Sequence, residues 1–582
     1  MSAQAEALLA ALPRRLSDIP QRWAMRTPDA PALCEGALSW TYRDLHQAVQ
    51  AAAALLRELQ VRPGDRVMIV GENSALQVAL IFAAGACDAW AVCVNARLSA
   101  RELDAIRDHC GARRVLYTIG VSPDAAAHAE RHGAALYEAQ PAVTREAEDT
   151  VTREAESTVE ADATREAKYV RGLLGALAIG ALNSAAEVEP VSAENHEQVA
   201  ALIYTTGTTG TPKGVMLTHR NLLFIAQISS TLRSLVADDR VYGVLPISHV
   251  YGLASVMLGT LNAGACLYLV PRYTPHGLLD ALRNQGITML QGVPAMYARL
   301  LECLKDVQAD AQGDAQAHRQ AGGQSEGQAQ AQAHAGHTFS ARSLRFIYAG
   351  GSPLDPTLKR EVEQLFGQPL HNGYGMTESS PTISQTRREA PRHDTSVGPA
   401  IPGIDVRIVD SAQRDVVAGE PGELWVRGPN VMKGYYREPV LTAQALLPGG
   451  WLNTGDIAQQ ADDGALFIVG RTKELIIRSG FNVYPVEVET ALNSHPSVIQ
   501  SAVVGRTVVD GNEEVVAFVE LDPARAVAID ELHTYLAKIL SPYKCPAEIV
   551  AMQALPAAAT GKILKGRLKQ QAQQMYEARQ QA

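Results

Sequence analysis

The sequence lacks the features that mark several large classes of protein. Its formal net charge is −10 and no run of Lys and Arg occurs, so the concentrated basic surface that nucleic-acid binding requires is missing. The seven cysteines are scattered without a Cys-x-x-Cys pair, which argues against a disulfide framework or a structural zinc site and favours a reducing cytoplasm. Gln77 and Asp88 interrupt the most apolar stretch, 76–94, and the first 22 residues contain no signal-peptide core. We therefore expect a cytoplasmic protein without a transmembrane segment.

What is present is a long alternation of strand and helix patterns. A chain of 582 residues exceeds one ordinary core, so two or three domains are expected. The alternation predicts α/β architecture with two mainly parallel sheet-and-helix subdomains. From about residue 397, short strands with Gly and Pro turns indicate a β-rich subdomain. We expect a large N-terminal domain over 1–472 and a small α+β domain over 473–582. The strands expected in the sheets are 66–70, 90–94, 115–117, 199–204, 241–245, 266–270, 287–291 and 344–348.

Two segments break this pattern. One, near 140–168, contains three near repeats of Thr-Arg-Glu-Ala, and the other, near 307–338, is rich in Gln, Ala, Gly and His. Neither holds enough apolar residues to fold alone, so we interpret both as surface insertions, with a partner-binding arm as the alternative.

A loop rich in glycine and threonine follows the strand that ends at Tyr204. Its glycines allow backbone amides to turn inward, its hydroxyls can donate to phosphate oxygens, and Lys213 adds a mobile positive charge. Counted from Gly207, the sixth residue is Pro212, so this is not a Walker A loop. The loop predicts a phosphate site, while a turn without a nucleotide role remains the alternative. Its candidate phosphate-binding residues are Thr205, Thr206, Gly207, Thr208, Thr209, Gly210 and Lys213.

This loop and the motifs after it resemble the adenylate-forming superfamily, which includes acyl-CoA synthetases, amino-acid-activating adenylation domains and beetle luciferases. The resemblance runs from about residue 20 to residue 570, and its motifs occur in the family's order. It implies an acid–thiol ligase that uses ATP to make an acyl-adenylate and then transfers the acyl group to coenzyme A. The matching segments are 204–214, 245–252, 292–297, 348–354, 372–378, 451–456, 470–474 and 559–562.

The resemblance also implies roles for single residues in the adenylation step. Tyr374 would stack on adenine, Asp456 would accept hydrogen bonds from the ribose hydroxyls, and Arg471 would contact the ribose or phosphates. Glu378 is the implied Mg²⁺ ligand and, with Thr377, part of the catalytic motif. Lys562 would bring the carboxylate and the α-phosphate together, whereas Lys565 is interpreted as a solvated surface lysine. The remaining expected ATP/AMP contacts are Gly350, Gly351, Ser352, Asn372, Gly373, Gly375 and Met376.

The second half-reaction uses the same site after a domain rotation that the family implies. Lys473 matches the hinge, and rotation there would present Ser479, Gly480 and Phe481 to coenzyme A. His249 is implied as the gate beside the acyl carbonyl, with a satisfied core histidine as the alternative. The acyl pocket is expected to be lined by His249, Tyr251, Gly252, Tyr348, Gly350, Asn372 and Gly373.

These motif residues give the expected pocket no carboxylate for an amine and no Arg for a second carboxylate. An apolar tail therefore fits best, and medium- or long-chain fatty acids are favoured over cinnamate- or benzoate-like acids. The expected partners are the small-molecule acid, ATP and coenzyme A; the oligomeric state stays open, with a homodimer as one option. Three rival functions remain: a stand-alone enzyme that loads a carrier protein, a luciferase-like oxygenase, and a non-catalytic ligand-binding relative.

Overall fold

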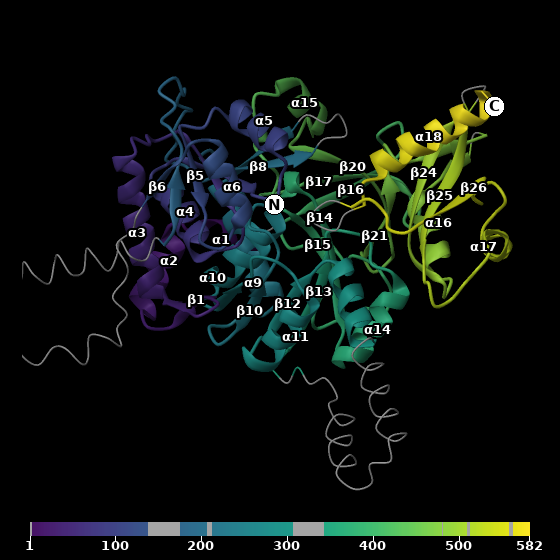
Figure 1. Ribbon diagram of the computed structural model, residues 1–582, viewed down its shortest axis with the longest axis horizontal. Coiled ribbons are helices and arrows are strands. Elements are labelled where there is room, and N and C mark those ends of the chain that lie inside the picture. Colours follow the sequence, from purple (N-terminus) through teal and green to yellow (C-terminus); the bar gives the residue numbers. More distant parts are fainter. Residues whose placement is uncertain are drawn as a thin grey trace, which may run out of the picture.

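The computed structural model describes residues 3–137, 175–206, 212–305, 341, 343–479, 481–508, 512–557 and 563–581. Both expected insertions lie outside these residues. Figure 1 shows two sheet-and-helix layers side by side, a smaller sheet beside them, and a C-terminal unit that ends in a long helix. This arrangement matches the expected α/β class, with a large N-terminal part and a small C-terminal one.

The first large sheet has eight strands in the order β15-β14-β13-β12-β10-β11-β1-β2. Every pairing from β14 to β1 is parallel, as expected, whereas β15 and β2 close the two edges as antiparallel strands. The carboxyl ends of β13 and β14 therefore meet at one edge, where α/β sheets commonly bind ligands. The strands are β1 Pro31–Glu35, β2 Leu38–Thr41, β10 Arg240–Gly243, β11 Cys266–Leu269, β12 Met289–Gly292, β13 Phe346–Gly350, β14 Leu370–Gly375 and β15 Thr382–Gln385.

The second large sheet has the order β18-β9-β8-β4-β3-β5-β7-β6. Its centre, from β8 to β5, is parallel, and the outer pairings are antiparallel. The Gly/Thr-rich loop connects β8 to its antiparallel neighbour β9, and Thr206 at the end of β8 lies opposite Pro212 at the start of β9. The strands are β3 Arg66–Gly71, β4 Trp90–Asn95, β5 Arg114–Thr118, β6 Ala135–Tyr137, β7 Leu177–Ile179, β8 Val199–Thr206, β9 Pro212–Thr218 and β18 Gly434–Tyr435.

The helices begin and end where the local sequence signals place them. In α14, Asp355 accepts hydrogen bonds from two N–H groups of the first turn, Pro356 opens the helix, and Gly367 closes it at a φ of 64°. Ser99 and Glu102 form the expected capping box of α5. The helices of the N-terminal part are α1 Ala3–Ala10, α2 Asp18–Arg26, α3 Tyr42–Glu58, α4 Ala75–Ala86, α5 Ala100–Cys110, α6 Pro123–Arg131, α9 His219–Leu232, α10 Gly259–Asn262, α11 Pro275–Asn284, α14 Pro356–Phe366 and α15 Pro439–Ala445, with the π-helix η1 Tyr251–Leu258 and the 3-10 turn η2 Thr377–Ser379.

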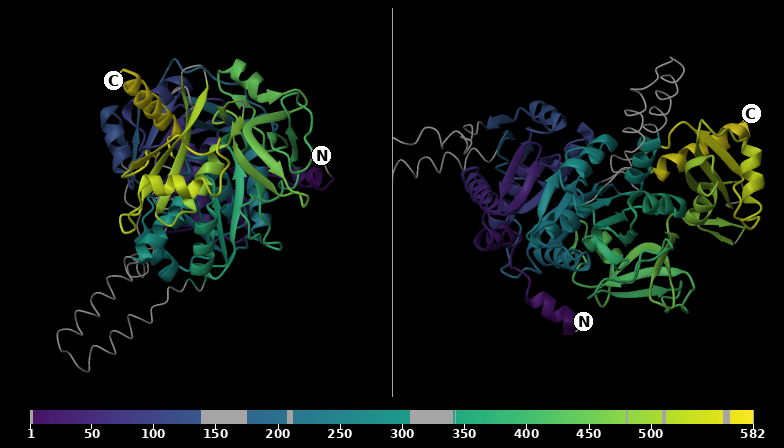
Figure 2. Two further views of the ribbon diagram at one scale, coloured as in Figure 1. Left: turned by 90° about the vertical axis from the view of Figure 1, so that its right-hand side faces the viewer. Right: turned by 90° about the horizontal axis from the view of Figure 1, so that it is seen from below.

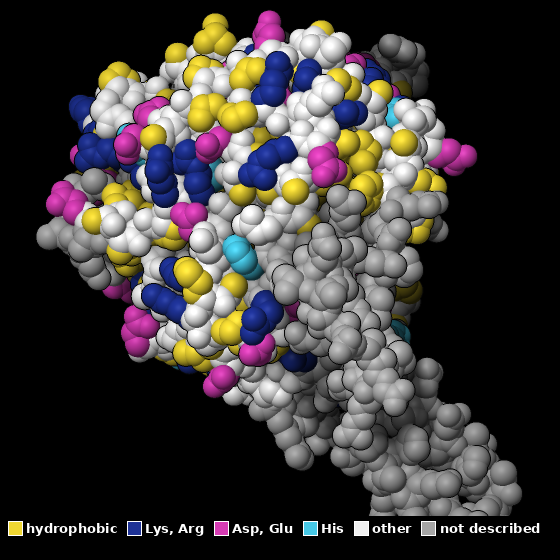
Figure 3. All heavy atoms as spheres, turned by 90° about the vertical axis from the view of Figure 1, so that its left-hand side faces the viewer, with side chains coloured by type: hydrophobic (Ala, Val, Ile, Leu, Met, Phe, Trp, Pro, Cys, Tyr) yellow, Lys and Arg dark blue, Asp and Glu magenta, His cyan; other side chains and the backbone are white. Residues whose placement is uncertain are grey.

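The apolar stretch 76–94 forms α4 and β4, as expected, and both are buried inside the protein. Across the described ranges, none of the helices combines the length and the apolar character that crossing a membrane requires. On the face drawn in Figure 3, Lys and Arg side chains are interspersed with Asp and Glu, so that face carries no field of one sign.

The β-rich section forms a five-stranded antiparallel sheet, with the order β16-β17-β20-β19 and β21 beside β20. Beyond it, the C-terminal unit has its own buried clusters, which include Val488, Val503 and Leu532 on one side and Phe518 and Leu568 on the other. Figure 2 shows this unit at one end of the molecule. The elements are β16 Asp405–Val409, β17 Gly422–Arg427, β19 Leu446–Leu447, β20 Trp451–Gln460, β21 Leu466–Arg471, β22 Ile476–Arg478, β23 Phe481–Val483, β24 Val498–Thr507, β25 Glu513–Leu521, β26 Glu548–Met552, α16 Pro485–Asn493, α17 Ile529–Leu536 and α18 Lys565–Gln581.

Candidate active site

Three of the predicted nucleotide-binding residues meet between the first large sheet and the β-rich sheet. Asp456 of β20 is buried; it accepts a hydrogen bond from the Tyr374 hydroxyl and pairs with Arg471 of β21 at 3.1 Å. Burial, followed by the charge of Asp456, raises the pKa of Tyr374 well above its ordinary value. Burial opposes the charged form of Arg471, but the charges of Asp456 and Glu474 raise its pKa overall. The result is a fixed carboxylate beside a permanent cation.

A second group links the predicted metal ligand to the phosphate loop. The Tyr435 hydroxyl donates to Oε1 of the buried Glu378 at 2.7 Å, and the Lys213 ammonium lies 5.8 Å from the centre of the Tyr435 ring. The carbonyl of Glu378 also accepts the N–H of Met432 at 2.9 Å. The charge of Glu378 is the smallest of the contributions that raise the pKa of Arg471. Sequence reasoning missed Tyr435, because no motif around this residue singles it out.

The turns around this site depend on close backbone approaches. A side chain at Gly375 would place its Cβ 2.0 Å from the carbonyl oxygen of Pro381, and Gly351 has a φ of 84°. Gly351 and Ser352 are exposed, so an adenine could reach them. Asn372 also has a structural role, because its side-chain amide donates hydrogen bonds to the backbone carbonyls of Thr395 and Ser396. Thr377 is buried at the start of η2, and Met376 precedes it.

The expected acyl-pocket residues gather where η1 crosses the first large sheet. His249 is exposed, which contradicts the core-histidine alternative, and its Nδ1 accepts the N–H of Tyr251 at 3.2 Å. The rings of Tyr251 and Tyr348 lie edge to face with centroids 6.1 Å apart. A Cβ at Gly350 would lie within 3.2–3.5 Å of both rings, and one at Gly373 would lie 1.9 Å from the Tyr348 hydroxyl. The missing side chains of these two glycines therefore let the two tyrosines pack closely against β13 and β14.

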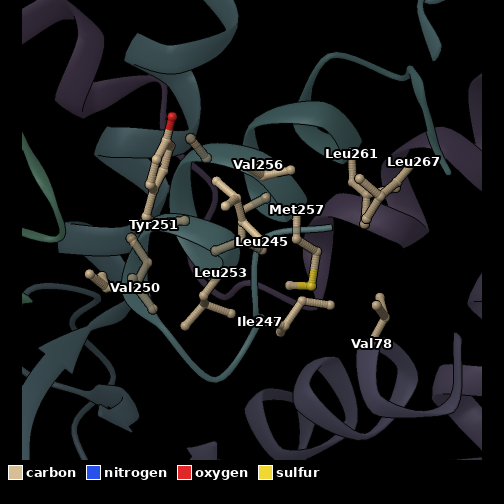
Figure 4. Close-up of a cluster of buried hydrophobic side chains, with 14 of the residues drawn as sticks. Val78, Leu245, Ile247, Val250, Tyr251, Leu253, Val256, Met257, Leu261 and Leu267 are labelled. Atoms are coloured by element: carbon tan, nitrogen blue, oxygen red, sulfur yellow. The ribbon is translucent and has the colours of Figure 1, made fainter. Parts of the chain in front are cut away.

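Gly252 differs from the other expected pocket residues. Its Cβ would fall 2.2 Å from the carbonyl oxygen of Pro246, so its missing side chain lets η1 pack onto the preceding loop. Figure 4 shows the aliphatic side chains of η1, including Leu253 and Met257, packed with Ile247 and Leu245 of that loop.

Several predicted residues cannot be placed. Gly207, Thr208, Thr209, Gly210, Gly480 and Lys562 lie outside the described residues, while Thr205 and Thr206 end β8. Lys473 is exposed between β21 and β22. Ser479 has a φ of 51°, and its N–H donates to Asn512 at 2.7 Å; Phe481 is half exposed and stacks on Tyr543 at 4.7 Å. Their assignment to hinge and coenzyme A contacts stays a prediction.

Lys565 is not the solvated lysine that the sequence suggested. Its ammonium lies 2.7 Å from Glu489 and 3.0 Å from Glu474, and only 20% of its side chain is exposed. Burial opposes its charge, but the two carboxylates raise its pKa overall. The interpretation was wrong because Glu474 and Glu489 lie far away in sequence and approach only in the fold. Glu474 directly follows the predicted hinge, so this ion pair joins the start of α18 to the hinge segment.

Comparison with known proteins agrees with this geometry. The family described as AMP-binding enzyme matches residues 20–436, and the one described as AMP-binding enzyme C-terminal domain matches 487–562. The chain is 32% identical to a feruloyl-CoA synthase from Amycolatopsis over 562 residues, which cover 95% of this chain and 98% of that protein. It is 30% identical over 574 residues to a long-chain-fatty-acid–CoA ligase from Salmonella typhimurium, with 96% and 94% covered.

A similar fold occurs in the solved structure of o-succinylbenzoate CoA synthetase from Bacillus subtilis in complex with its acyl-adenylate intermediate. The TM-score is 0.72, with 26% identity and with 95% of this chain and 97% of that chain covered. The family matches span most of the chain, and the relatives are aligned over nearly their whole length. The chain therefore belongs to the AMP-binding enzyme family and is an ATP-dependent acyl-CoA ligase.

Proposed function

We propose that this site condenses a carboxylic acid with ATP to form an acyl-adenylate and then passes the acyl group to coenzyme A. The observation that carries the proposal is a pair of contacts. Asp456 binds both Arg471 and Tyr374, and Tyr435 binds Glu378 while its ring lies near Lys213. The cations Lys213 and Arg471 suit a polyphosphate, and the Glu378 carboxylate suits the magnesium ion that accompanies it. Asp456 would hold the ribose and Tyr374 the adenine.

The first half-reaction joins two anions, so its main barrier is electrostatic. A carboxylate oxygen attacks the α-phosphorus, and the bond from that phosphorus to pyrophosphate breaks. Lys213 and Arg471 would neutralise the charge of the phosphates. Lys562 would neutralise the substrate carboxylate and the α-phosphate as they approach each other. Glu378 would hold Mg²⁺ together with phosphate oxygens and water, which are the oxygen ligands that this ion prefers. When bound, Mg²⁺ would supply further charge neutralisation.

The second half-reaction needs no protein nucleophile, because AMP is already a good leaving group. The sulfur of coenzyme A attacks the acyl carbon, the bond from that carbon to AMP breaks, and the thiol proton is released. Rotation about Lys473 would withdraw Lys562 and bring Ser479, Gly480 and Phe481 to the thiol. All seven cysteines are free thiols, which suits a reducing cytoplasm.

Two acid classes fit the pocket. Medium- or long-chain fatty acids are favoured by the uncharged motif residues, and the long-chain ligase relative supports them. Cinnamate- or benzoate-like acids are favoured by the edge-to-face tyrosines beside Gly350, and the feruloyl-CoA synthase relative supports them.

The test is acid-dependent exchange of pyrophosphate into ATP, followed by coenzyme A-dependent release of AMP, over a panel of both acid classes. We expect exchange without coenzyme A and AMP release only with it. No exchange with any acid would favour the non-catalytic relative. Exchange without transfer to coenzyme A would favour the carrier-loading enzyme, and oxygen consumption or light emission would favour the oxygenase.

Tyr435→Phe should weaken the response to magnesium. Its hydroxyl holds Oε1 of Glu378, and losing a hydrogen bond to a charged group costs about 1.5 kcal/mol, which corresponds to a roughly tenfold higher half-saturating Mg²⁺ concentration. Magnesium titration of pyrophosphate exchange measures this. The matched control is Tyr436→Phe, whose hydroxyl donates to Glu189 instead. A Tyr435→Phe enzyme with unchanged magnesium dependence would show that this hydroxyl does not position Glu378.

A further inference from the structure

Arg233, at the end of α9, is a fully buried cation beside the proposed acyl pocket. Its guanidinium donates to the carbonyl of Ser255 at 2.9 Å and more weakly to Gln385 at 3.4 Å, and it lies 5.0 Å from the centre of the Tyr348 ring. No carboxylate pairs with it among the residues that the structure describes, and its Nε has no hydrogen-bond partner there. Burying a charge without an opposite charge beside it costs free energy, so a ligand group that compensates the charge of Arg233 is expected here.

Gln291 of β12 is a buried, uncharged side chain that also lacks hydrogen-bond partners among the described residues. Its side chain is fully buried, and neither its amide oxygen nor its amide nitrogen has a partner in the described structure. The same holds for the amide nitrogen of Gln385 and for the hydroxyl of Tyr251. In Figure 4 the Tyr251 hydroxyl points away from the aliphatic side chains of η1. Native proteins leave few buried polar atoms unsatisfied, so several such groups together indicate a missing partner.

Strand register places these groups on one face of the first large sheet. Gln291 lies opposite Tyr348, Gly350 opposite Gly373, and Gly373 opposite Gln385. Residues paired across strands, and residues two apart along a strand, point to the same side. The polar groups therefore share the side of Gly350 and Gly373, and Arg233 and Tyr251 reach it from α9 and η1.

The order along the strands gives the direction of the substrate. Gly350 ends β13 at the nucleotide edge, whereas Tyr348 and Gln291 lie further from that edge. An acid whose carboxylate sits at the edge would thus point its far end towards Arg233 and Gln291. The unpartnered groups there are N–H groups of Arg233, Gln291 and Gln385, which donate hydrogen bonds, and the amide oxygen of Gln291, which accepts one.

We propose that the acid ends in a hydrogen-bond-accepting oxygen, which binds between Arg233, Gln291 and Gln385. This inference rests on the proposed adenylation site, because it takes the pocket beside Gly350 as the acyl pocket. It narrows both acid classes: a fatty acid would carry a terminal hydroxyl or carboxylate, and an aryl acid a ring hydroxyl. A methyl-terminated or unsubstituted tail would leave the buried donors without partners. Sites built to hydrogen-bond a substrate oxygen discriminate strongly against substrate analogues that lack this oxygen.

The test compares matched acids by kcat/KM for adenylation. Each pair shares its skeleton and differs in one oxygen: 4-hydroxycinnamate with cinnamate, an ω-hydroxy fatty acid with its methyl-terminated analogue, and a dicarboxylic acid with the monocarboxylic acid of equal length. For every skeleton that is activated, we expect a preference of at least about tenfold for the oxygen-bearing acid. The hydroxyl and dicarboxylate pairs distinguish a neutral oxygen from a second carboxylate.

Gln291→Leu should reduce that preference at least about tenfold, mainly by slowing the oxygen-bearing acid. The matched control is Gln77→Leu, which removes another buried glutamine with an unpartnered amide oxygen, on α4, and should leave the preference unchanged. Equal use of both members of every pair, or a preference that Gln291→Leu does not change, would overturn the proposal. Absence of pyrophosphate exchange with every acid would instead overturn the proposed function. If Gln291→Leu does not fold, Gln385→Leu is expected to give the same reduction.

Discussion

Lys562→Ala is expected to slow adenylate formation by about a hundredfold to a thousandfold while leaving thioester formation from supplied acyl-adenylate nearly intact. The magnitude is that of removing one well-placed charge-stabilising group from a transition state. The asymmetry follows from the chemistry of the two steps. In the first, a carboxylate approaches a triphosphate and a cation between them is essential, whereas in the second a thiol attacks an activated carbonyl with AMP as leaving group. Pyrophosphate exchange measures the first step, and coenzyme A consumption with synthetic acyl-adenylate measures the second.

The control for Lys562→Ala is Lys569→Ala, a substitution further along α18. Lys569 is 52% exposed and lies 3.6 Å from Glu513, so its removal is expected to change neither half-reaction. If Lys562→Ala lowered both half-reactions equally, the division of labour between the two steps would be wrong. If it lowered neither, the adenylation cation would have to be Lys213 or Arg471 alone.

The elements of the fold were predictable because each has a strong local signal. The capping box at Ser99 and Glu102 and the Asp355-Pro356 start of α14 act over a few residues, and the structure has both. The antiparallel edges of the large sheets were not foreseen, because the short connections between β1 and β2, between β8 and β9, and between β14 and β15 were not interpreted as chain reversals. The order of the motifs was enough to identify the family, because the motifs are spread over most of the length of the chain.

The parts of the site that sequence reasoning missed are contacts between distant segments. Tyr435 meets Glu378 across 57 positions, and Arg233 meets Gln385 across 152. Neither Tyr435 nor Arg233 stands in a pattern that singles it out, because an isolated tyrosine or arginine has many common roles. A role for Tyr435 is indicated by its hydrogen bond to Glu378, and a role for Arg233 by its burial without a paired carboxylate among the described residues. The expectation of an uncharged acyl pocket rested on the motif residues, and the proposed role of Arg233 would add a charge from outside them.

Lys565→Met is expected to destabilise the C-terminal unit by about 2 kcal/mol, because it leaves Glu474 and Glu489 close together without their cation. Breaking a fully buried pair costs about 3–5 kcal/mol, and the partial exposure of these three side chains reduces that figure. Hydrogen exchange of the full-length chain, followed in β24 and α18, measures the local free energy of opening. Lys569→Met is the matched control, expected to change that free energy by less than about 0.5 kcal/mol.

Lys565→Met also tests whether Lys565 connects the predicted hinge at Lys473 to the segment that contains Lys562. Ala557 and Ile563, which flank the segment that contains Lys562, pair with each other, and Lys565 pairs with Glu474, one residue after Lys473. Lys565→Met should therefore slow adenylate formation more than thioester formation, and Lys565→Arg, which keeps the charge, should restore most of the rate. Equal losses in both half-reactions would limit Lys565 to a role in stability. Adding Glu489→Gln to Lys565→Met should recover part of the lost stability, because it removes one of the two unpaired carboxylates.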